Sequence, residues 1–122
     1  MQVFGIDHVN LRVPPELEAQ CLAFYGETLG LPRIEKPAEL AKRGGAWFKA
    51  GLHELHISLE PGADGWASQR HVCLLVDSLD RAQTKLEAAG VGLDEGISEA
   101  EGLRRFFIRD PAGNRIEIAT RT

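Results

Sequence analysis

Four side chains that can bind a divalent cation occur at matching places in the two halves of this 122-residue sequence. They are His8 and His56 in the first half and His71 and Glu117 in the second. Imidazole nitrogens together with a carboxylate suit Zn, Fe(II), Mn, Co or Ni, because these ions accept mixed nitrogen and oxygen ligands. A soft metal would need more sulfur, and calcium would need more oxygen. A single histidine is more often a hydrogen-bonded structural side chain than a ligand, so the prediction of one metal site depends on the joint pattern.

The strands that carry these residues are predicted from alternation with a period of two. Residues 7–13 and 70–76 place apolar side chains on one face, so His8 and His71 point to the other face at equivalent positions. The last strands of the two halves align in the same way, which makes His56 and Glu117 equivalent. If helices cover the apolar faces, we expect the four side chains to share a concave surface on the opposite side.

The two halves are predicted to have the same order of elements, at a spacing of about sixty residues. This order is a strand, a helix and three further strands. The first helix begins at Pro15 and ends at Gly30, and the second has Asp77 or Ser78 as its N-cap and ends at Gly90. The later strands are predicted over 31–36, 45–49, 52–60, 91–94, 104–109 and 114–120, and residues 110–113 form the last hairpin turn. The sequence therefore predicts an α+β fold of two tandem βαβββ modules, with a cupped mixed sheet and helices on its outer face. This is one domain over 1–122, with module one at 1–60, a linker at 61–69 and module two at 70–122.

Composition excludes several partners. A net charge of −4 and a pI near 5.5 match a phosphate backbone poorly, so we expect no nucleic acid partner. There is no apolar run of membrane-spanning length and no basic or apolar leader, so we expect no membrane association and a cytoplasmic protein.

Cys21 and Cys73 lack metal-knuckle or CxxC spacing, and both are predicted to be buried thiols. A chain of this length buries roughly two thirds of its unfolded surface without help, so a metal would serve chemistry rather than stability.

Several motifs resemble those of the vicinal oxygen chelate superfamily, which includes glyoxalases, bleomycin resistance proteins and extradiol dioxygenases. They are Asp7-His8-Val9, Phe24-Tyr25 followed by Leu29-Gly30-Leu31, His71 in the second half, and Asp110-Pro111-Ala112-Gly113-Asn114-Arg115-Ile116-Glu117. The resemblance covers essentially the whole chain. It implies paired βαβββ modules, a divalent metal held by the first and last strands of each module, and usually a homodimer. His8, His71 and Glu117 match the ligand positions of the family, and His56 falls where glyoxalases place a fourth ligand.

One position departs from the closest patterns. Bacterial enzymes similar to glyoxalase I usually carry Glu at the fourth position and related epimerases carry Gln, whereas this chain has His56. The role of catalytic base, which a carboxylate beside the metal fills in those enzymes, would fall to Glu117 or to Glu54. With His56 bound, an octahedral ion keeps two open positions, which suits proton transfer. Without it, three ligands form a facial triad that suits a dioxygenase or a thiol transferase.

Residues that bind the substrate are predicted from the same faces. Counting across the hairpins places Trp47 opposite Glu54 and Phe106 opposite Glu117, so both aromatic side chains are expected to line the concave surface. Asn10, Arg12 and Arg104 are expected on the same faces, where they would orient an anionic or phenolic substrate. The alternatives are that the aromatic residues pack a dimer interface and that the arginines are solvated.

The predicted function is that of a metal-dependent enzyme of glyoxalase type acting on a small substrate with vicinal oxygens. Its chemistry would be that of an isomerase or lyase, through a metal-chelated enediolate or alkoxide. The alternatives are a non-catalytic drug-sequestering protein resembling bleomycin resistance proteins, and a three-ligand thiol transferase or dioxygenase. The sequence leaves open whether one site takes its ligands from one chain or from exchanged modules of a homodimer.

Overall fold

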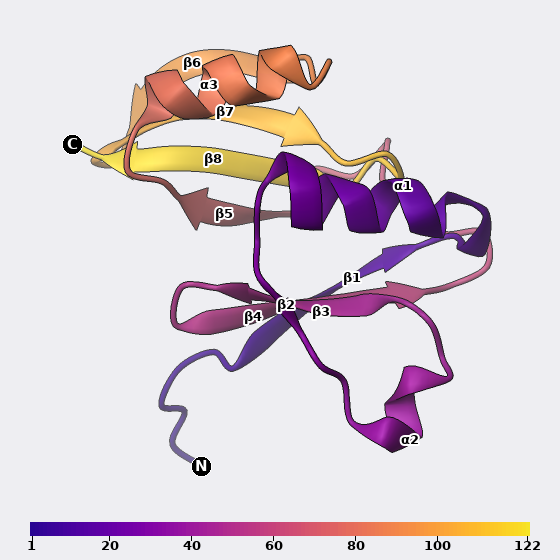
Figure 1. Cartoon of the computed structure of the whole chain (residues 1–122). Helices are drawn as coiled ribbons and strands as arrows, with labels where there is room; N and C mark the ends of the chain where they lie inside the picture. Colours follow the sequence, from indigo (N-terminus) through magenta and orange to yellow (C-terminus); the bar gives the residue numbers. More distant parts are fainter. The chain divides into compact units, whose positions relative to one another are not determined.

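The computed structural model describes all residues from 1 to 122 and divides them into two compact units, 1–63 and 64–122. Each unit has one four-stranded mixed sheet and the strand–helix–strand order predicted for a βαβββ module (Figure 1). The α+β class is therefore confirmed, and the boundary between the units falls inside the predicted linker at 61–69. None of the helices combines the length and the apolar character that crossing a bilayer requires.

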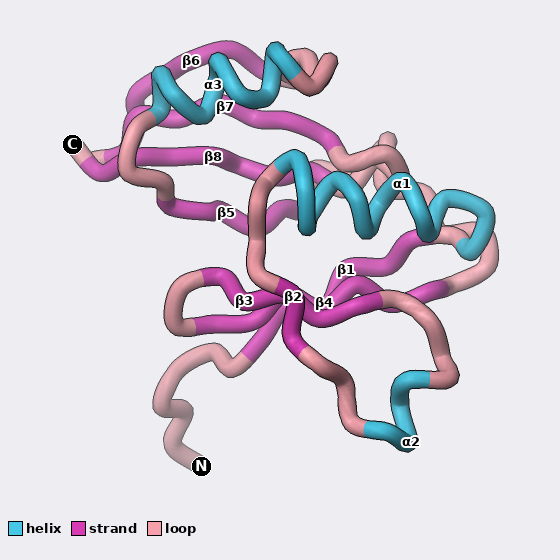
Figure 2. The backbone as a smooth tube through the Cα atoms, in the orientation of Figure 1, coloured by secondary structure: helices cyan, strands magenta, loops and turns pink.

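The first unit contains a sheet with strand order β1-β4-β3-β2, in which β1 runs parallel to β4. A continuous helical segment follows β1 and passes from a 3₁₀ turn through α1 into a wider π turn, as the first cyan run of Figure 2 shows. A short helix, α2, lies in a loop before β3. The elements are β1 (His8–Val13), the 3₁₀ turn Pro15–Leu17, α1 (Glu18–Ala23), the π turn Phe24–Thr28, β2 (Arg33–Ile34), α2 (Ala38–Ala41), β3 (Ala46–Ala50) and β4 (His53–Leu59).

The second unit repeats this topology with strand order β5-β8-β7-β6 and with β5 parallel to β8. Its helix α3 is capped by Ser78, whose side chain accepts a hydrogen bond from the backbone N–H of Arg81. Figure 1 shows α3 lying across one face of β7 and β8. The elements are β5 (His71–Leu75), α3 (Leu79–Ala88), β6 (Glu95–Ala100), β7 (Leu103–Arg109) and β8 (Arg115–Arg121).

The apolar residues of the central strands β4 and β8 alternate with polar ones, so they lie on one face of each sheet, because successive side chains of a strand point to opposite faces. The buried apolar residues share this face with side chains from the helical segment of the same unit. In the first unit they include Cys21, Phe24, Tyr25, Phe48, Leu55 and Ile57, and in the second Leu79, Leu86, Phe106, Ile108, Ile116 and Ile118. The opposite face of each sheet, which we call its polar face, carries the predicted metal ligands.

Two predictions of local structure are wrong. The first strand after α3 was predicted over 91–94 but forms over Glu95–Ala100, and almost all of its residues are exposed. An edge strand that buries no face has no alternation of apolar residues to detect, so its position cannot be predicted from hydrophobic pattern. Cys21 is buried as predicted, but Cys73 is exposed, because it follows His71 by two residues and lies on the polar face of β5.

Candidate functional site

Each polar face carries one cluster of side chains that can do chemistry. The first cluster consists of His8, Trp47, Glu54 and His56, from three neighbouring strands of the first unit. The second cluster consists of His71, Cys73, Arg105 and Glu117, from three neighbouring strands of the second unit. The two clusters therefore contain all four predicted metal ligands, two in each unit.

Stacked rings organise the first cluster. The His56 ring lies between the His8 ring, at 4.1 Å and an interplanar angle of 13°, and the Trp47 ring, at 3.9 Å and 3°. Only 5% of His56 is exposed, so the neighbouring rings restrict its rotation. Trp47 pairs with His56 across the hairpin and not with Glu54, so the predicted register is wrong. The error is two residues, which leaves Trp47 on the predicted face.

Hydrogen bonds fix which ring nitrogens of the first cluster are available. His56 Nε2 donates to Glu54 Oε1 at 2.9 Å, and His8 Nδ1 donates to Asp7 Oδ2 at 2.8 Å. The hydrogen bond from His8 holds the pKa of the Asp7 carboxyl below its usual range. With the proton of neutral His8 on Nδ1, its Nε2 keeps a lone pair that can bind a metal.

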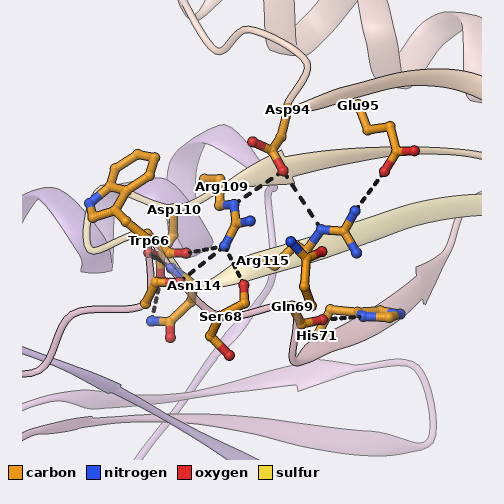
Figure 3. A network of polar contacts seen from close by, with 12 residues as sticks. Trp66, Ser68, Gln69, His71, Asp94, Glu95, Arg109, Asp110, Asn114 and Arg115 are labelled. Atoms are coloured by element: carbon orange, nitrogen blue, oxygen red, sulfur yellow. Dashed lines mark hydrogen bonds and ion pairs between the residues drawn. The ribbon is translucent and has the colours of Figure 1, made fainter.

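Ionic contacts organise the second cluster, in which Glu117 is only 4% exposed. Arg105 Nη1 donates to Glu117 Oε1 at 3.0 Å, and His71 Nε2 lies 3.2 Å from Glu117 Oε2. The other ring nitrogen of His71, Nδ1, lies 3.0 Å from the carbonyl oxygen of Gln69, as Figure 3 shows. A carbonyl oxygen can only accept, so Nδ1 carries the proton, and Nε2 of neutral His71 faces the carboxylate with a lone pair.

Nε2 of His71 and Oε2 of Glu117 both present lone pairs, which repel each other at this distance unless a cation lies between them. That cation is either a proton on His71 or a metal ion. Zn, Fe and Mn sites in proteins commonly combine an imidazole nitrogen with a carboxylate oxygen. The other N–H group of such an imidazole is usually hydrogen-bonded to a carbonyl or carboxylate oxygen, as it is in His71. His71 and Glu117 therefore fit a divalent metal. Neither cluster by itself gathers three or more His, Cys, Asp or Glu side chains in a way that could hold a metal ion. A single site with all four ligands stays a prediction.

Cys73 pairs with Glu117 across the parallel strands β5 and β8. Although the residue as a whole is exposed, partial desolvation of its thiol raises the pKa to about 11, and the charge of Glu117 adds to this effect. The Cys73 thiol is therefore protonated at neutral pH in the metal-free protein.

The positions predicted for Phe106 and Arg104 are wrong. Phe106 pairs with Ile118 and is fully buried on the core face, and Phe107 pairs with Glu117 instead. Arg104 lies on the same face as Phe106 and forms an ion pair with Asp80 of α3 at 3.6 Å. A slip of one residue in register moves every side chain to the opposite face.

The slip has a specific cause in the last hairpin. The structure pairs Arg109 with Arg115, so the loop contains Asn114 as well as the four predicted residues 110–113. The Asp110 carboxylate accepts hydrogen bonds from the backbone N–H and the side-chain Nδ2 of Asn114, and this draws Asn114 into the turn. As a result, Arg105 and Phe107 lie on the polar face, and neither was predicted to do so from the sequence. Their spacing from Glu117 would have indicated them if the loop length had been known.

The remaining predicted residues lie on the polar face of β1. Asn10 Nδ2 donates to Ser58 Oγ of β4 at 2.7 Å, so its amide is oriented by a neighbouring strand. Arg12 is exposed and pairs with Ser58 in the register. Both residues lie on the face of β1 that the sequence predicted, and their roles in substrate binding stay predictions.

The fold and the two clusters define a class of proteins built from paired βαβββ units with histidine and carboxylate residues on the polar faces. The model of the Glyoxalase/Bleomycin resistance protein/Dioxygenase superfamily matches residues 5–118. The chain belongs to this superfamily, as its motifs indicated. No match was found among the curated proteins.

Solved structures agree with this assignment. A protein from Bacillus anthracis described as belonging to the glyoxalase family is 37% identical, with a TM-score of 0.90 over 100% of this chain and 98% of that one. Lactoylglutathione lyase from Agrobacterium tumefaciens is 22% identical, with a TM-score of 0.74 over 98% and 95% of the two chains. An antibiotic binding protein from a Streptomyces species is 20% identical, with a TM-score of 0.76 over 100% and 99%. The fold is thus shared by an enzyme and by a binding protein, and the chemistry must be argued from the residues.

Proposed function

We propose that this protein is a metal-dependent enzyme of glyoxalase type that acts on a small substrate with vicinal oxygens, by isomerase or lyase chemistry. The observation that carries the proposal is the pair formed by His71 and Glu117. Nε2 of His71 and Oε2 of Glu117 lie 3.2 Å apart, while Nδ1 of the same ring is engaged by the carbonyl of Gln69. His71 and Glu117 would hold a divalent metal, which would supply Lewis-acid polarisation of two neighbouring substrate oxygens.

The first cluster would supply the other ligands, His8 and His56. His8 is prepared for this role, because Asp7 engages its Nδ1 and leaves Nε2 as the donor atom. These ligands come either from the same chain or from the partner chain of a homodimer. Zn, Fe(II), Mn, Co and Ni all accept this donor set.

Glu54 is the better candidate for the catalytic base. Both oxygens of Glu117 are engaged, one by Arg105 and one by His71, and the residue is buried. The Glu54 side chain is 30% exposed, and only its Oε1 is engaged, by His56. Its second oxygen can therefore accept a proton from a substrate carbon beside a polarised carbonyl.

The hydrogen bond between His56 and Glu54 also favours a second candidate. Because Nε2 of His56 is already engaged, a metal bound by His8, His71 and Glu117 alone would have the facial arrangement used by thiol transferases and dioxygenases. A drug-sequestering protein would need no metal at all.

Elemental analysis of the purified protein without a polyhistidine tag tests the proposal. We expect close to one divalent ion per chain in the wild type and a loss of metal in Glu117→Ala. His53→Ala is the matched control, since His53 is an exposed histidine of β4 with the opposite parity to His56. If His56→Ala keeps its metal, the three-ligand chemistries replace the glyoxalase type. A wild type that stays empty after incubation with each of the five metals would contradict any metal-dependent enzyme.

A further inference from the structure

Arg105 is a charged side chain beside Glu117 that none of the predicted roles explains. Arg105 is two residues before Phe107 on β7, so both side chains lie on the same face of the strand. Its guanidinium group therefore reaches the polar face next to the carboxylate of Glu117. The side chain is 27% exposed, which leaves it accessible to a small molecule. It therefore adjoins the proposed metal ligand without being enclosed by protein.

The hydrogen-bonding capacity of Arg105 is largely unused. A guanidinium group has five N–H donors, and the structure gives Arg105 a single hydrogen bond, from Nη1 to Glu117. Its Nε atom is buried and has no hydrogen-bond partner. Buried donors in folded proteins are nearly always paired, so Arg105 keeps donor capacity that its protein neighbours do not use.

Two neighbouring arginines of the same unit each have more polar partners than Arg105 has. Arg109 donates to Asp94 at 3.1 Å and to the carbonyl oxygens of three residues, Gly65, Ser68 and Gly113. Arg115 donates to Glu95 at 2.7 Å, and its Nε, which like that of Arg105 has no hydrogen-bond partner, lies 3.6 Å from the Asp94 carboxylate (Figure 3). Arg105 has only one carboxylate partner, which it shares with His71.

The net charge of the second cluster also favours a negatively charged ligand. In the metal-free protein the charges of Arg105 and Glu117 cancel. A divalent ion at Glu117 would leave this cluster with a surplus of positive charge. A site with such a surplus favours a ligand that carries negative charge.

We propose that Arg105 binds a carboxylate group of the substrate, so that the substrate class is a small carboxylic acid with an oxygen on the neighbouring carbon. This inference rests on the proposed function, because the metal would hold the vicinal oxygens. The planar fork of a guanidinium group matches the two oxygens of a carboxylate, which a lysine ammonium group does not. The Phe107 ring, 5.4 Å from Cζ of Arg105, supports the guanidinium group from the same strand.

Calorimetric titration of the metal-loaded protein with two probes of similar size tests the inference. Pyruvate carries a carboxylate beside a carbonyl oxygen, whereas hydroxyacetone has vicinal oxygens and no charge. The proteins compared are the wild type, Arg105→Gln, Arg105→Lys and the control Arg104→Gln. Arg104 is the adjacent arginine on the opposite face of β7, where it pairs with Asp80. Each variant is titrated at a metal concentration that saturates it, and its metal content is measured in parallel.

We expect Arg105→Gln to weaken pyruvate binding about 10- to 100-fold, which is the loss of one charge-assisted hydrogen-bonding group. Arg105→Lys should recover only part of this loss, and hydroxyacetone binding should be unchanged in every variant. Arg104→Gln should bind pyruvate as the wild type does. If Arg105→Gln holds the metal and still binds pyruvate with wild-type affinity, the inference is wrong while the proposed function stands. If the wild type takes up no metal, the proposed function itself fails, and this result is visible in the metal analysis alone.

Discussion

The two units place His56 and Glu117 at equivalent positions of equivalent strands, but they hold these residues by different forces. In the first cluster the imidazole ring of His56 is stacked between two other rings and makes one hydrogen bond. In the second cluster a buried carboxylate is held between a guanidinium group and an imidazole. The difference follows from the cost of burial, because a buried carboxylate must be paired with positive charge or hydrogen-bond donors, whereas much of the surface of an imidazole ring can be buried by packing against other rings.

This comparison shows that one backbone topology can support two kinds of site. The first cluster combines ring stacking with the hydrogen bonds that His8 and His56 make to carboxylates, and it contains no arginine. The second depends on compensated charge, which changes when a cation or an anion binds. We therefore expect ligand binding to alter the second cluster more than the first.

The largest expected effect concerns the core face of the second unit. Phe106 faces Ile118, whereas the equivalent position of the first unit holds Ala46, which faces Ile57. Because Phe106 is fully buried, Phe106→Ala should lower the free energy of unfolding by about 3–5 kcal/mol, measured by urea denaturation. Phe106→Leu, which keeps most of the volume, is the control. A small loss of stability together with weakened ligand binding would instead restore Phe106 to the polar face, as the sequence had indicated.

The next effect separates the two central hairpins. The hairpin of the first unit turns through two exposed residues, Gly51 and Leu52, whereas that of the second closes around the buried carboxylate of Asp110. This carboxylate accepts from the backbone N–H groups of Ala112 and Asn114. Removing it leaves buried donors unpaired, so Asp110→Ala should cost roughly 1–3 kcal/mol in chemical denaturation. Asp110→Asn keeps one acceptor and should cost less, and equal losses in both variants would contradict this account.

The same hairpin shows how far the sequence could predict the site. The faces of β4 and β8 were predicted correctly, because Leu55, Ile57 and their equivalents alternate with polar residues. The loop length could not be predicted, since Asn114 is equally suited to a strand end and to a turn, and only its bonds to Asp110 decide between them. For that reason the sequence identified Glu117 but assigned Phe106 and Arg104 to the face that Arg105 and Phe107 occupy.

The third prediction tests the ring stack of the first cluster. Trp47→Ala removes one of the two rings that enclose His56, and an aromatic pair contributes about 0.5–1.5 kcal/mol beyond its buried area. We expect a loss of stability of this size, with a shift of the His56 ring resonances in NMR spectra. Trp47→Phe should retain most of the stability and of the ring positions. Unchanged His56 resonances in Trp47→Ala would show that the hydrogen bond to Glu54 alone fixes the ring.

The smallest effect distinguishes the helices that follow the first strand of each unit. The helix of the second unit begins with Ser78, whose hydroxyl accepts from the backbone N–H of Arg81 at 3.2 Å. The helical segment of the first unit begins after Pro14, has Pro15 in its first turn and has no side-chain cap. The exposed Ser78 cap should contribute about 0.5 kcal/mol, the lower end of the usual range, so Ser78→Ala should lower the midpoint of urea unfolding slightly. Ser78→Asp, which keeps an acceptor at the helix start, should preserve the midpoint. A larger loss in Ser78→Ala would mean that the start of α3 also positions β5, the strand that carries His71.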